Sequence, residues 1–203
     1  MALITNIAIV ISAAGTSKRM GTPKQLLKWG TTTLLEHAIE TALQLNGNET
    51  IVVLGANFNQ IKKQIDSQNS VILNHSGWES GLGSSIAFGI KYLLQSNSKA
   101  DGVLIMLADQ PLIDVQYLKL MVAAFEPSKG HIVATSYDRK KQGVPALFDK
   151  TYFDELIQLQ DDKGAKTIIE KHVASILTLS APVNITDIDT PEDYETLYRA
   201  NHQ

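Results

Sequence analysis

Short apolar runs alternate with amphipathic stretches through the first two-thirds of the chain. The continuous apolar runs, which are typical of buried strands, lie at residues 7–11, 50–54, 71–73 and 103–107. Between them apolar residues recur every three or four positions, as in Ile86, Ile90 and Leu93, which indicates helices. Strand–helix alternation of this kind predicts a mostly parallel sheet with helices on both faces.

The last third of the chain predicts a few antiparallel strands. Further strands are expected at 132–135, 144–148, 176–179 and 183–188, and further helices at 152–159 and 165–172. The polar turn at 138–143 joins the first two of these strands, which favours a hairpin. There is no internal repeat or linker, so residues 1–203 are expected to form one α/β domain.

Three helix starts carry explicit capping signals. Thr33 and Glu36 form a capping box, in which each side chain bonds to the other residue's main chain. Asp114 precedes an apolar stripe and is expected to cap it. Thr190, followed by proline and two acidic residues, predicts the start of a final helix.

Composition places the chain among soluble globular proteins and excludes several other classes of protein and of site. Of 203 residues, 44% are hydrophobic and 19% charged. No apolar run approaches the roughly 18 residues of a membrane span, and residues 1–11 lack the basic start and cleavage site of a secretion signal. The absence of cysteine excludes disulfides and thiolate sites. We therefore expect a cytoplasmic protein without a membrane segment.

Charge is distributed unevenly, although the net charge of −3 argues against a nucleic-acid surface. No acidic residue precedes Glu36, and four cations lie in that part of the chain. Residues 172–198 contain no lysine or arginine but five acidic residues. The two segments are either surfaces that pair with each other or the two halves of a metal–nucleotide site.

The stretch from Ile11 to Leu27 has the composition of a phosphate-binding loop. Small residues follow the first strand, and Lys18, Arg19 and Lys24 follow the small residues. Exposed backbone N–H groups and nearby cations suit a polyphosphate, although an ordinary loop with solvated basic residues has the same composition. The spacing matches neither the G-x-x-x-x-G-K-[ST] loop nor the G-x-G-x-x-G dinucleotide motif.

Three polar segments directly follow predicted strands. They are the opening loop, the glycine- and serine-rich loop 74–85, and Asp109. Ligands of such sheets bind beyond the carboxyl ends of the strands, so we expect these segments to converge on one site. A carboxylate at the end of a buried strand is costly to bury, so Asp109 is either a Mg²⁺ ligand or a helix cap.

Residues 13–24, AAGTSKRMGTPK, resemble the A-A-G-x-S-x-R-M-G-x-P-K signature of the MobA-like nucleotidyltransferases, which include molybdopterin guanylyl- and cytidylyltransferases. Ser12 departs from the leucine expected before this signature. The segments at 74–85, 109–111 and 187–193 resemble further motifs of the family in the same order. The resemblance implies a three-layer Rossmann-like fold of the nucleotide-diphospho-sugar transferase type, with a mostly parallel sheet.

The resemblance also implies roles for individual residues. Arg19, Lys24 and Asp109 would be catalytic, and Mg²⁺ would bind Asp109 and Asp189, with Asp187 as the alternative to Asp189. The expected nucleotide-binding residues are Ala13, Ala14, Gly15, Ser17, Arg19, Lys24, Asn74, Gly83, Ser84 and Ser85. Carboxylates are expected on the side of the metal away from the cations, and Asp193 is expected to be uninvolved. Trp78 either lines the acceptor pocket or packs in the core, with the core favoured, and Lys163 is a candidate contact to the acceptor phosphate.

The implied activity is transfer of CMP from CTP to the terminal phosphate of molybdopterin, with release of pyrophosphate. Ala14 before Gly15 favours the cytidylyl over the guanylyl branch. Two other functions stay open: transfer to a sugar phosphate or another small molecule, and a non-catalytic nucleotide-binding factor that matures a molybdoenzyme. A molybdoenzyme or its chaperone is a further candidate partner.

Overall fold

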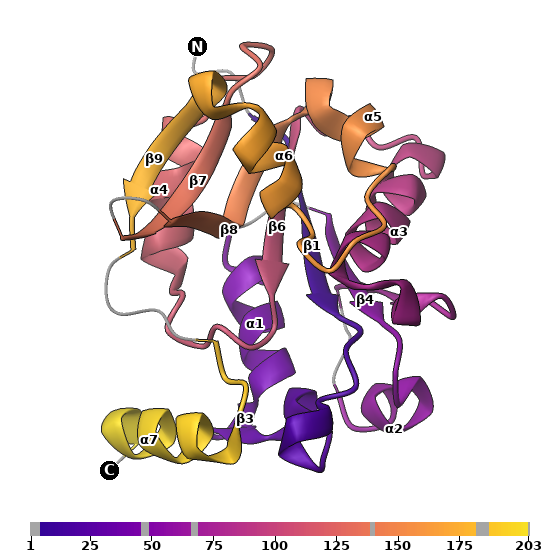
Figure 1. Ribbon diagram of the computed structural model, residues 1–203, viewed down its shortest axis with the longest axis vertical. Coiled ribbons are helices and arrows are strands. Elements are labelled where there is room, and N and C mark those ends of the chain that lie inside the picture. Colours follow the sequence, from indigo (N-terminus) through magenta and orange to yellow (C-terminus); the bar gives the residue numbers. More distant parts are fainter. Residues whose placement is uncertain (1–4, 46–48, 66–68, 139–140, 182–186, 203) are drawn as a thin grey trace.

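The structure is a computed structural model that describes residues 5–45, 49–65, 69–138, 141–181 and 187–202. Its centre is a seven-stranded sheet in the order β5-β4-β1-β6-β8-β7-β9 (Figure 1). The strands are β1 (Ile7–Ala13), β4 (Thr50–Leu54), β5 (Val71–Asn74), β6 (Gly102–Leu107), β7 (Ile132–Asp138), β8 (Lys141–Asp149) and β9 (Ile176–Ser180). Only β8 runs antiparallel to its neighbours, β6 and β7, so the sheet is mostly parallel, as the alternation predicts.

Helices cover both faces of the sheet, which gives three layers. The helices are α1 (Leu34–Leu43), α2 (Phe58–Lys62), α3 (Leu82–Gln95), α4 (Val115–Ala124), α5 (Phe153–Leu156), α6 (Lys166–Lys171) and α7 (Pro191–His202). Side chains alternate along β1, so Ile9 and Ile11 pack against α1, α2 and α4, whereas Ala8 and Val10 pack against α3, α5 and α6. Within the described residues, none of the helices is long and apolar enough to cross a membrane.

The predicted strands are confirmed except the last one. The strand expected at 183–188 falls largely outside the described residues, and Asp187 and Ile188 are not in a strand. The helix expected at 152–159 is shorter: α5 ends at Leu156 and follows a 3₁₀ turn, Lys150–Tyr152. A small antiparallel hairpin, β2 (Lys28–Trp29) with β3 (Thr32–Thr33), was not predicted, because two-residue strands leave no periodic pattern.

The predicted helix caps are confirmed atom by atom. The Thr33 hydroxyl accepts a hydrogen bond from Glu36 N at 3.2 Å, and the Glu36 carboxylate accepts one from Thr33 N at 3.1 Å. Asp114 Oδ1 caps α4 by accepting from Tyr117 N at 2.8 Å. Each bond provides an acceptor for a main-chain N–H group that has no partner inside the helix. The capping side chains lie within a few residues of these groups, so the capping signals can be recognised from the local sequence.

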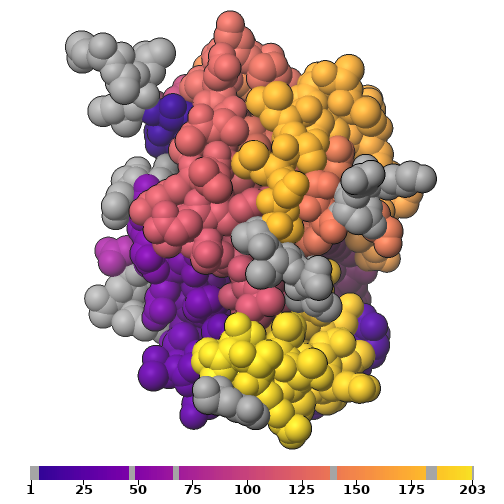
Figure 2. Space-filling view, turned by 90° about the vertical axis from the view of Figure 1, so that its left-hand side faces the viewer, coloured from indigo at the N-terminus to yellow at the C-terminus, as the bar shows by residue number. Residues whose placement is uncertain are grey.

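A third apolar cluster lies beyond the carboxyl edge of the sheet. It joins Met20 of the opening loop, Trp29 of the β2–β3 hairpin and Ile188, and the tyrosines of α7 pack against it. Figure 1 shows α7 and β3 together at one end of the molecule, and in Figure 2 the yellow C-terminal segment lies against the purple N-terminal one there. This cluster brings the acidic end of the chain beside the basic loop.

Helix α3 approaches the sheet closely at Gly89, in the middle of the helix. A Cβ at this position would lie 2.8 Å from Val10 Cγ1 and 3.1 Å from Val53 Cγ2. Gly89→Leu should therefore overpack the interface and lower the free energy of unfolding by about 1–3 kcal/mol, measured by urea denaturation. Gln95→Leu, on an exposed position of the same helix, should change the free energy by no more than about 0.5 kcal/mol. Equal stability of the two variants would contradict close packing at Gly89.

Candidate functional site

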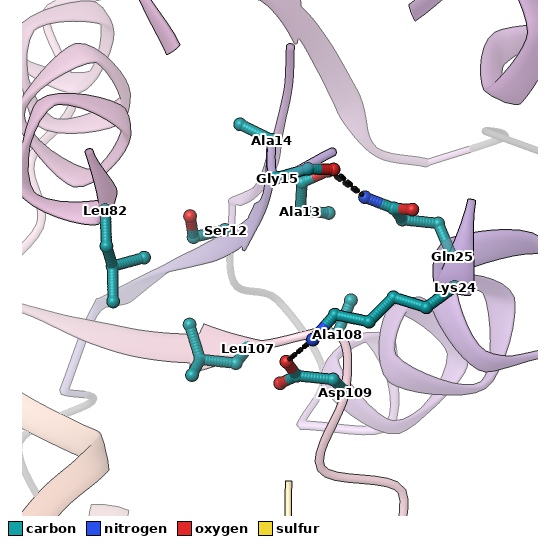
Figure 3. A pocket seen from close by; sticks show the side chains of 10 residues that line it. All are labelled: Ser12, Ala13, Ala14, Gly15, Lys24, Gln25, Leu82, Leu107, Ala108 and Asp109. Atoms are coloured by element: carbon teal, nitrogen blue, oxygen red, sulfur yellow. Dashed lines mark hydrogen bonds and ion pairs between the residues drawn. The ribbon is translucent and has the colours of Figure 1, made fainter. Parts of the chain in front are cut away.

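A cleft opens where the carboxyl ends of β1 and β6 lie side by side. Its central cavity, about 160 Å³, is lined by Ser12, Ala13, Ala14, Gly15, Lys24, Gln25, Leu82, Leu107, Ala108 and Asp109 (Figure 3). Leu82 also borders two neighbouring hollows of about 250 and 240 Å³. The opening loop and Asp109 therefore converge on one cavity as predicted, and the predicted loop 74–85 contributes Leu82 to it.

The opening loop is held against β1 by a buried amide. Gln25 is 3% exposed, and its Nε2 donates to Ala13 O at 2.8 Å and to Gly15 O at 3.0 Å. Ser17 takes a left-handed conformation, with φ 56°, and its hydroxyl accepts a hydrogen bond from Lys24 N at 3.0 Å. The Ser17 hydroxyl therefore stabilises the conformation of the loop. Gln25, whose role was not predicted from the sequence, anchors the main chain next to Lys24.

Lys24 occupies the centre of the site. Its ammonium group donates to Asp109 Oδ2, to Ile188 O at 3.1 Å and to Asp189 Oδ1 at 3.3 Å. The side chains of Lys24 and Asp109 are only 19% and 14% exposed. Figure 3 shows the Lys24 side chain reaching from the loop to Asp109 along one side of the cavity. In the free protein one ammonium group thus contacts both carboxylates, and the expectation that cations and carboxylates lie on opposite sides of a bound metal ion stays a prediction.

The electrostatics of this cluster keep Lys24 protonated. Burial alone would lower the pKa of Lys24, but the carboxylates of Asp109 and Asp189 outweigh burial and raise its pKa above the usual value. An opposite charge at hydrogen-bond distance favours the charged form. A change of pH in the physiological range therefore does not release Lys24 from the carboxylates.

The residues present fit a hard divalent cation. Asp109 Oδ1 is buried without a hydrogen-bond partner among the described residues, although a carboxylate oxygen has strong acceptor capacity. Asp109 does not cap a helix, since α4 is capped by Asp114. Two carboxylates that share one ammonium group would offer the oxygen ligands that Mg²⁺ and Mn²⁺ prefer once that group moves aside. No group of three or more metal-ligating side chains occurs in the described part of the chain.

Asp189 is positioned by several contacts at the start of α7. Arg19 Nη2 donates to Asp189 Oδ2 at 3.0 Å. Asp193 Oδ2 accepts from Asp189 N at 3.3 Å and from Thr190 N at 2.8 Å, while Thr190 Oγ1 caps the helix by accepting from Asp193 N at 3.2 Å. Ile188 N donates to Asp109 O at 3.0 Å. The Asp193 carboxylate therefore contacts the main chain of Asp189, and the expectation that Asp193 is not needed for activity stays a prediction.

Asp187 belongs to a different network. Its Oδ1 accepts from Gln110 Nε2 at 2.8 Å, and the same amide nitrogen lies 2.8 Å from the Tyr137 hydroxyl. Burial and the nearby Asp109 carboxylate raise the pKa of Asp187. Burial and the Asp187 carboxylate likewise raise the pKa of Tyr137 well above its usual value, so that its hydroxyl stays neutral and donates to Val144 O. Lys24 therefore links Asp109 to Asp189, and not to Asp187.

The two neighbouring hollows differ in charge. The acidic hollow is lined by Ser12, Ala14, Gly15, Thr16, Trp78, Glu79, Gly81, Leu82, Ser85 and Asp162, a set with two carboxylates and no cation among the described residues. The basic hollow contains three lysines beside Asp187 and is lined by Leu82, Leu107, Gln110, Tyr137, Lys141, Gln142, Gly143, Val144, Lys163, Ala165, Lys166 and Asp187. The predicted placement of Lys163 at the site is consistent with this lining.

The loop 74–85 contributes fewer cleft residues than predicted. Ser85 and Trp78 line the acidic hollow, and Trp78 is half-buried over Gly55, so the expectation that it packs in the core is wrong. Ser84 instead donates to Gly81 O at 2.8 Å and lies 3.1 Å from the His75 ring nitrogen.

Two further residues of this loop, Gly83 and Asn74, do not line any of the three hollows. A Cβ at Gly83 would lie 2.8 Å from Asp161 O, so the lack of a side chain at Gly83 allows the loop that contains Asp161 to approach. Asn74 is exposed and is not among the lining residues. Direct nucleotide contacts of Asn74, Gly83 and Ser84 stay predictions.

The central position of Lys24 makes a prediction about metal binding. Lys24→Met removes the ammonium group that competes with a metal ion for both carboxylates. In the absence of nucleotide, the affinity for Mn²⁺ should therefore rise about ten-fold or more. A ten-fold change corresponds to about the free energy of one charge-assisted hydrogen bond. The measurement is Mn²⁺ titration followed by electron paramagnetic resonance. Lys18→Met removes a charge from an exposed position of the same loop and should change the affinity little. Weaker Mn²⁺ binding by Lys24→Met would contradict the competition.

Several known proteins are similar to this chain over most of its length. A family model described as the MobA-like NTP transferase domain matches residues 9–176. The chain is 28% identical to nicotine blue oxidoreductase of Paenarthrobacter nicotinovorans, covering 90% of this chain and 92% of the relative. It is also 28% identical to the purine catabolism protein PucB of Bacillus subtilis, covering 94% of this chain and 95% of the relative.

Solved structures extend the likeness to the whole fold. The crystal structure of Rv0371c from Mycobacterium tuberculosis superposes with a TM-score of 0.84 at 28% identity, covering 96% of this chain and 98% of the other. A structure of Rv0371c in complex with manganese superposes with a TM-score of 0.80 at 25% identity, covering 97% and 100% of the two chains. The family match spans most of the chain and includes the loop, Lys24 and Asp109, and so the chain belongs to the MobA-like NTP transferase family.

Proposed function

We propose that this nucleotidyltransferase transfers CMP from CTP to the terminal phosphate of molybdopterin, in the cytoplasm and with Mg²⁺. The observation that carries the proposal is the cluster of Lys24, Asp109 and Asp189 beside a loop of small residues. Gly15 leaves open space there, since a Cβ would meet nothing within 4 Å. A triphosphate can approach such a backbone closely and meet a cation that stays charged.

The charges of the two hollows support one orientation of the substrates. A nucleoside carries no charge, so the carboxylates of Glu79 and Asp162 in the acidic hollow do not repel it. An acceptor that ends in a phosphate suits the basic hollow with Lys141, Lys163 and Lys166. The α-phosphate would then lie in the central cavity between the two, next to Lys24 and Asp109.

The reaction in this arrangement is an in-line displacement. An oxygen of the acceptor phosphate attacks the α-phosphorus of CTP, the bond from that phosphorus to the bridging oxygen breaks, and pyrophosphate leaves with the electron pair. Lys24 and Arg19 exchange their carboxylate partners for phosphate oxygens and stabilise the charge that moves onto the pyrophosphate. A divalent cation held by Asp109 and Asp189 would supply further charge neutralisation.

The choice of CTP rests on the resemblance and on Ala14. This residue is 4% exposed and lines both the central cavity and the acidic hollow. Its methyl group reduces the room for a larger purine, although a single group in a pocket discriminates by only roughly 1–3 kcal/mol. The molybdopterin acceptor comes from the family resemblance.

Pyrophosphate release tests the proposed function most directly. The protein is supplied with each of the four NTPs and Mg²⁺, with and without molybdopterin that carries its metal. We expect release to require the acceptor and to be fastest with CTP. Equal release with GTP would refute the role of Ala14, and release with a sugar phosphate but not with molybdopterin would assign a different acceptor.

The shared role of the two carboxylates predicts a non-additive double variant. Asp109→Asn and Asp189→Asn should each reduce kcat/KM sharply, whereas the double variant should lose much less than the product of the two losses, because both act on one ion. Asp154→Asn, at an exposed position in α5, is the control and should match the parent. Strictly multiplicative losses would show that the two aspartates act independently.

A further inference from the structure

The loop between α5 and α6 is locked onto the start of α3. Gly83 N donates to Asp161 O at 2.7 Å, and a Cβ at Gly83 would meet that oxygen at 2.8 Å. Gly81 has φ +101°, and a Cβ there would overlap Asp162 Oδ1. Glycine is therefore needed at both positions for the two segments to approach, and their contact fixes where Asp162 lies.

The two neighbouring aspartates of this loop have different surroundings. Asp161 Oδ1 accepts from Gly164 N at 3.0 Å and Oδ2 accepts from Thr167 Oγ1 at 2.9 Å, so both oxygens hold the loop together. Asp162 instead lines the acidic hollow, facing the same space as Ala14 and Trp78. Among the described residues, no hydrogen bond or ion pair occupies its carboxylate. The exposed Asp162 carboxylate is thus an available acceptor next to Gly81, in the same hollow as residues of the opening loop.

We propose that Asp162 selects the base of the nucleotide by accepting a hydrogen bond from the 4-amino group of cytosine. This inference rests on the proposed function, in which the nucleoside lies in the acidic hollow. A carboxylate can only accept, and the 4-amino group is the N–H donor that cytosine offers, a pairing that Asp and Glu also make with cytosine in DNA. Uracil carries a carbonyl oxygen at the same position, which the carboxylate repels.

Asp162→Asn tests this assignment while keeping the size of the side chain. Its amide offers both a donor and an acceptor, so CTP should bind more weakly and UTP more tightly. The ratio of CTP to UTP affinity, measured by calorimetry with Mg²⁺, should fall about ten-fold or more. Asp154→Asn, on α5 and exposed, should leave the ratio unchanged.

A second variant separates base selection from loop structure. Asp161→Asn replaces one of the two acceptor oxygens that hold the loop with a donor, so it should weaken the binding of CTP and of UTP alike. An unchanged ratio in Asp162→Asn, with both affinities reduced equally, would assign Asp162 to the ribose or to the loop and overturn the inference. If the parent protein binds CTP and UTP but Asp162→Asn behaves like the parent, only the inference fails. If the parent binds no nucleotide, the proposed function fails as well.

Discussion

The site is organised by one ammonium group shared among three oxygen acceptors. Lys24 holds Asp109, Asp189 and the carbonyl of Ile188 together, and the side chains of Lys24 and Asp109 are largely buried. Carboxylates placed this close together repel one another unless a cation lies between them. In the free protein the Lys24 ammonium group thus lies where a metal ion would lie in the substrate complex. Binding of the nucleotide with its metal ion would replace the ammonium group between the carboxylates. In this view Lys24 keeps the carboxylates in position before the substrate arrives.

The rest of the fold places these groups. Parallel pairing of β1 with β6 brings the opening loop and Asp109 to one edge of the sheet. The third apolar cluster then attaches the segment before α7 to that edge, through the buried side chain of Ile188 packed with Met20 and Trp29. The main chain of Ile188 bonds to Asp109 on one side and to Lys24 on the other. Packing away from the cleft therefore controls the position of Asp189.

Features set by neighbouring residues could be predicted from the sequence, and features set by tertiary packing could not. The capping box of Thr33 and Glu36, the strands and the strand-end position of Asp109 follow from local patterns. The contact between Lys24 and Asp189 joins residues 165 positions apart, and the helix α7 that enables it packs through a hairpin too short to predict. Gln25 acts through hydrogen bonds to the main chain of Ala13 and Gly15, which form only when the loop folds back onto β1, so its sequence position does not suggest its role.

A crystal structure with Mg²⁺ and a non-hydrolysable CTP analogue tests the exchange of cations most directly. The account predicts one ion bound to oxygens of both Asp109 and Asp189 at about 2.1 Å, with the Lys24 ammonium moved onto the phosphates. It also predicts the base in the hollow lined by Trp78 and Asp162. A complex in which Lys24 still bonds Asp109, with the ion and the triphosphate bound elsewhere, would contradict it.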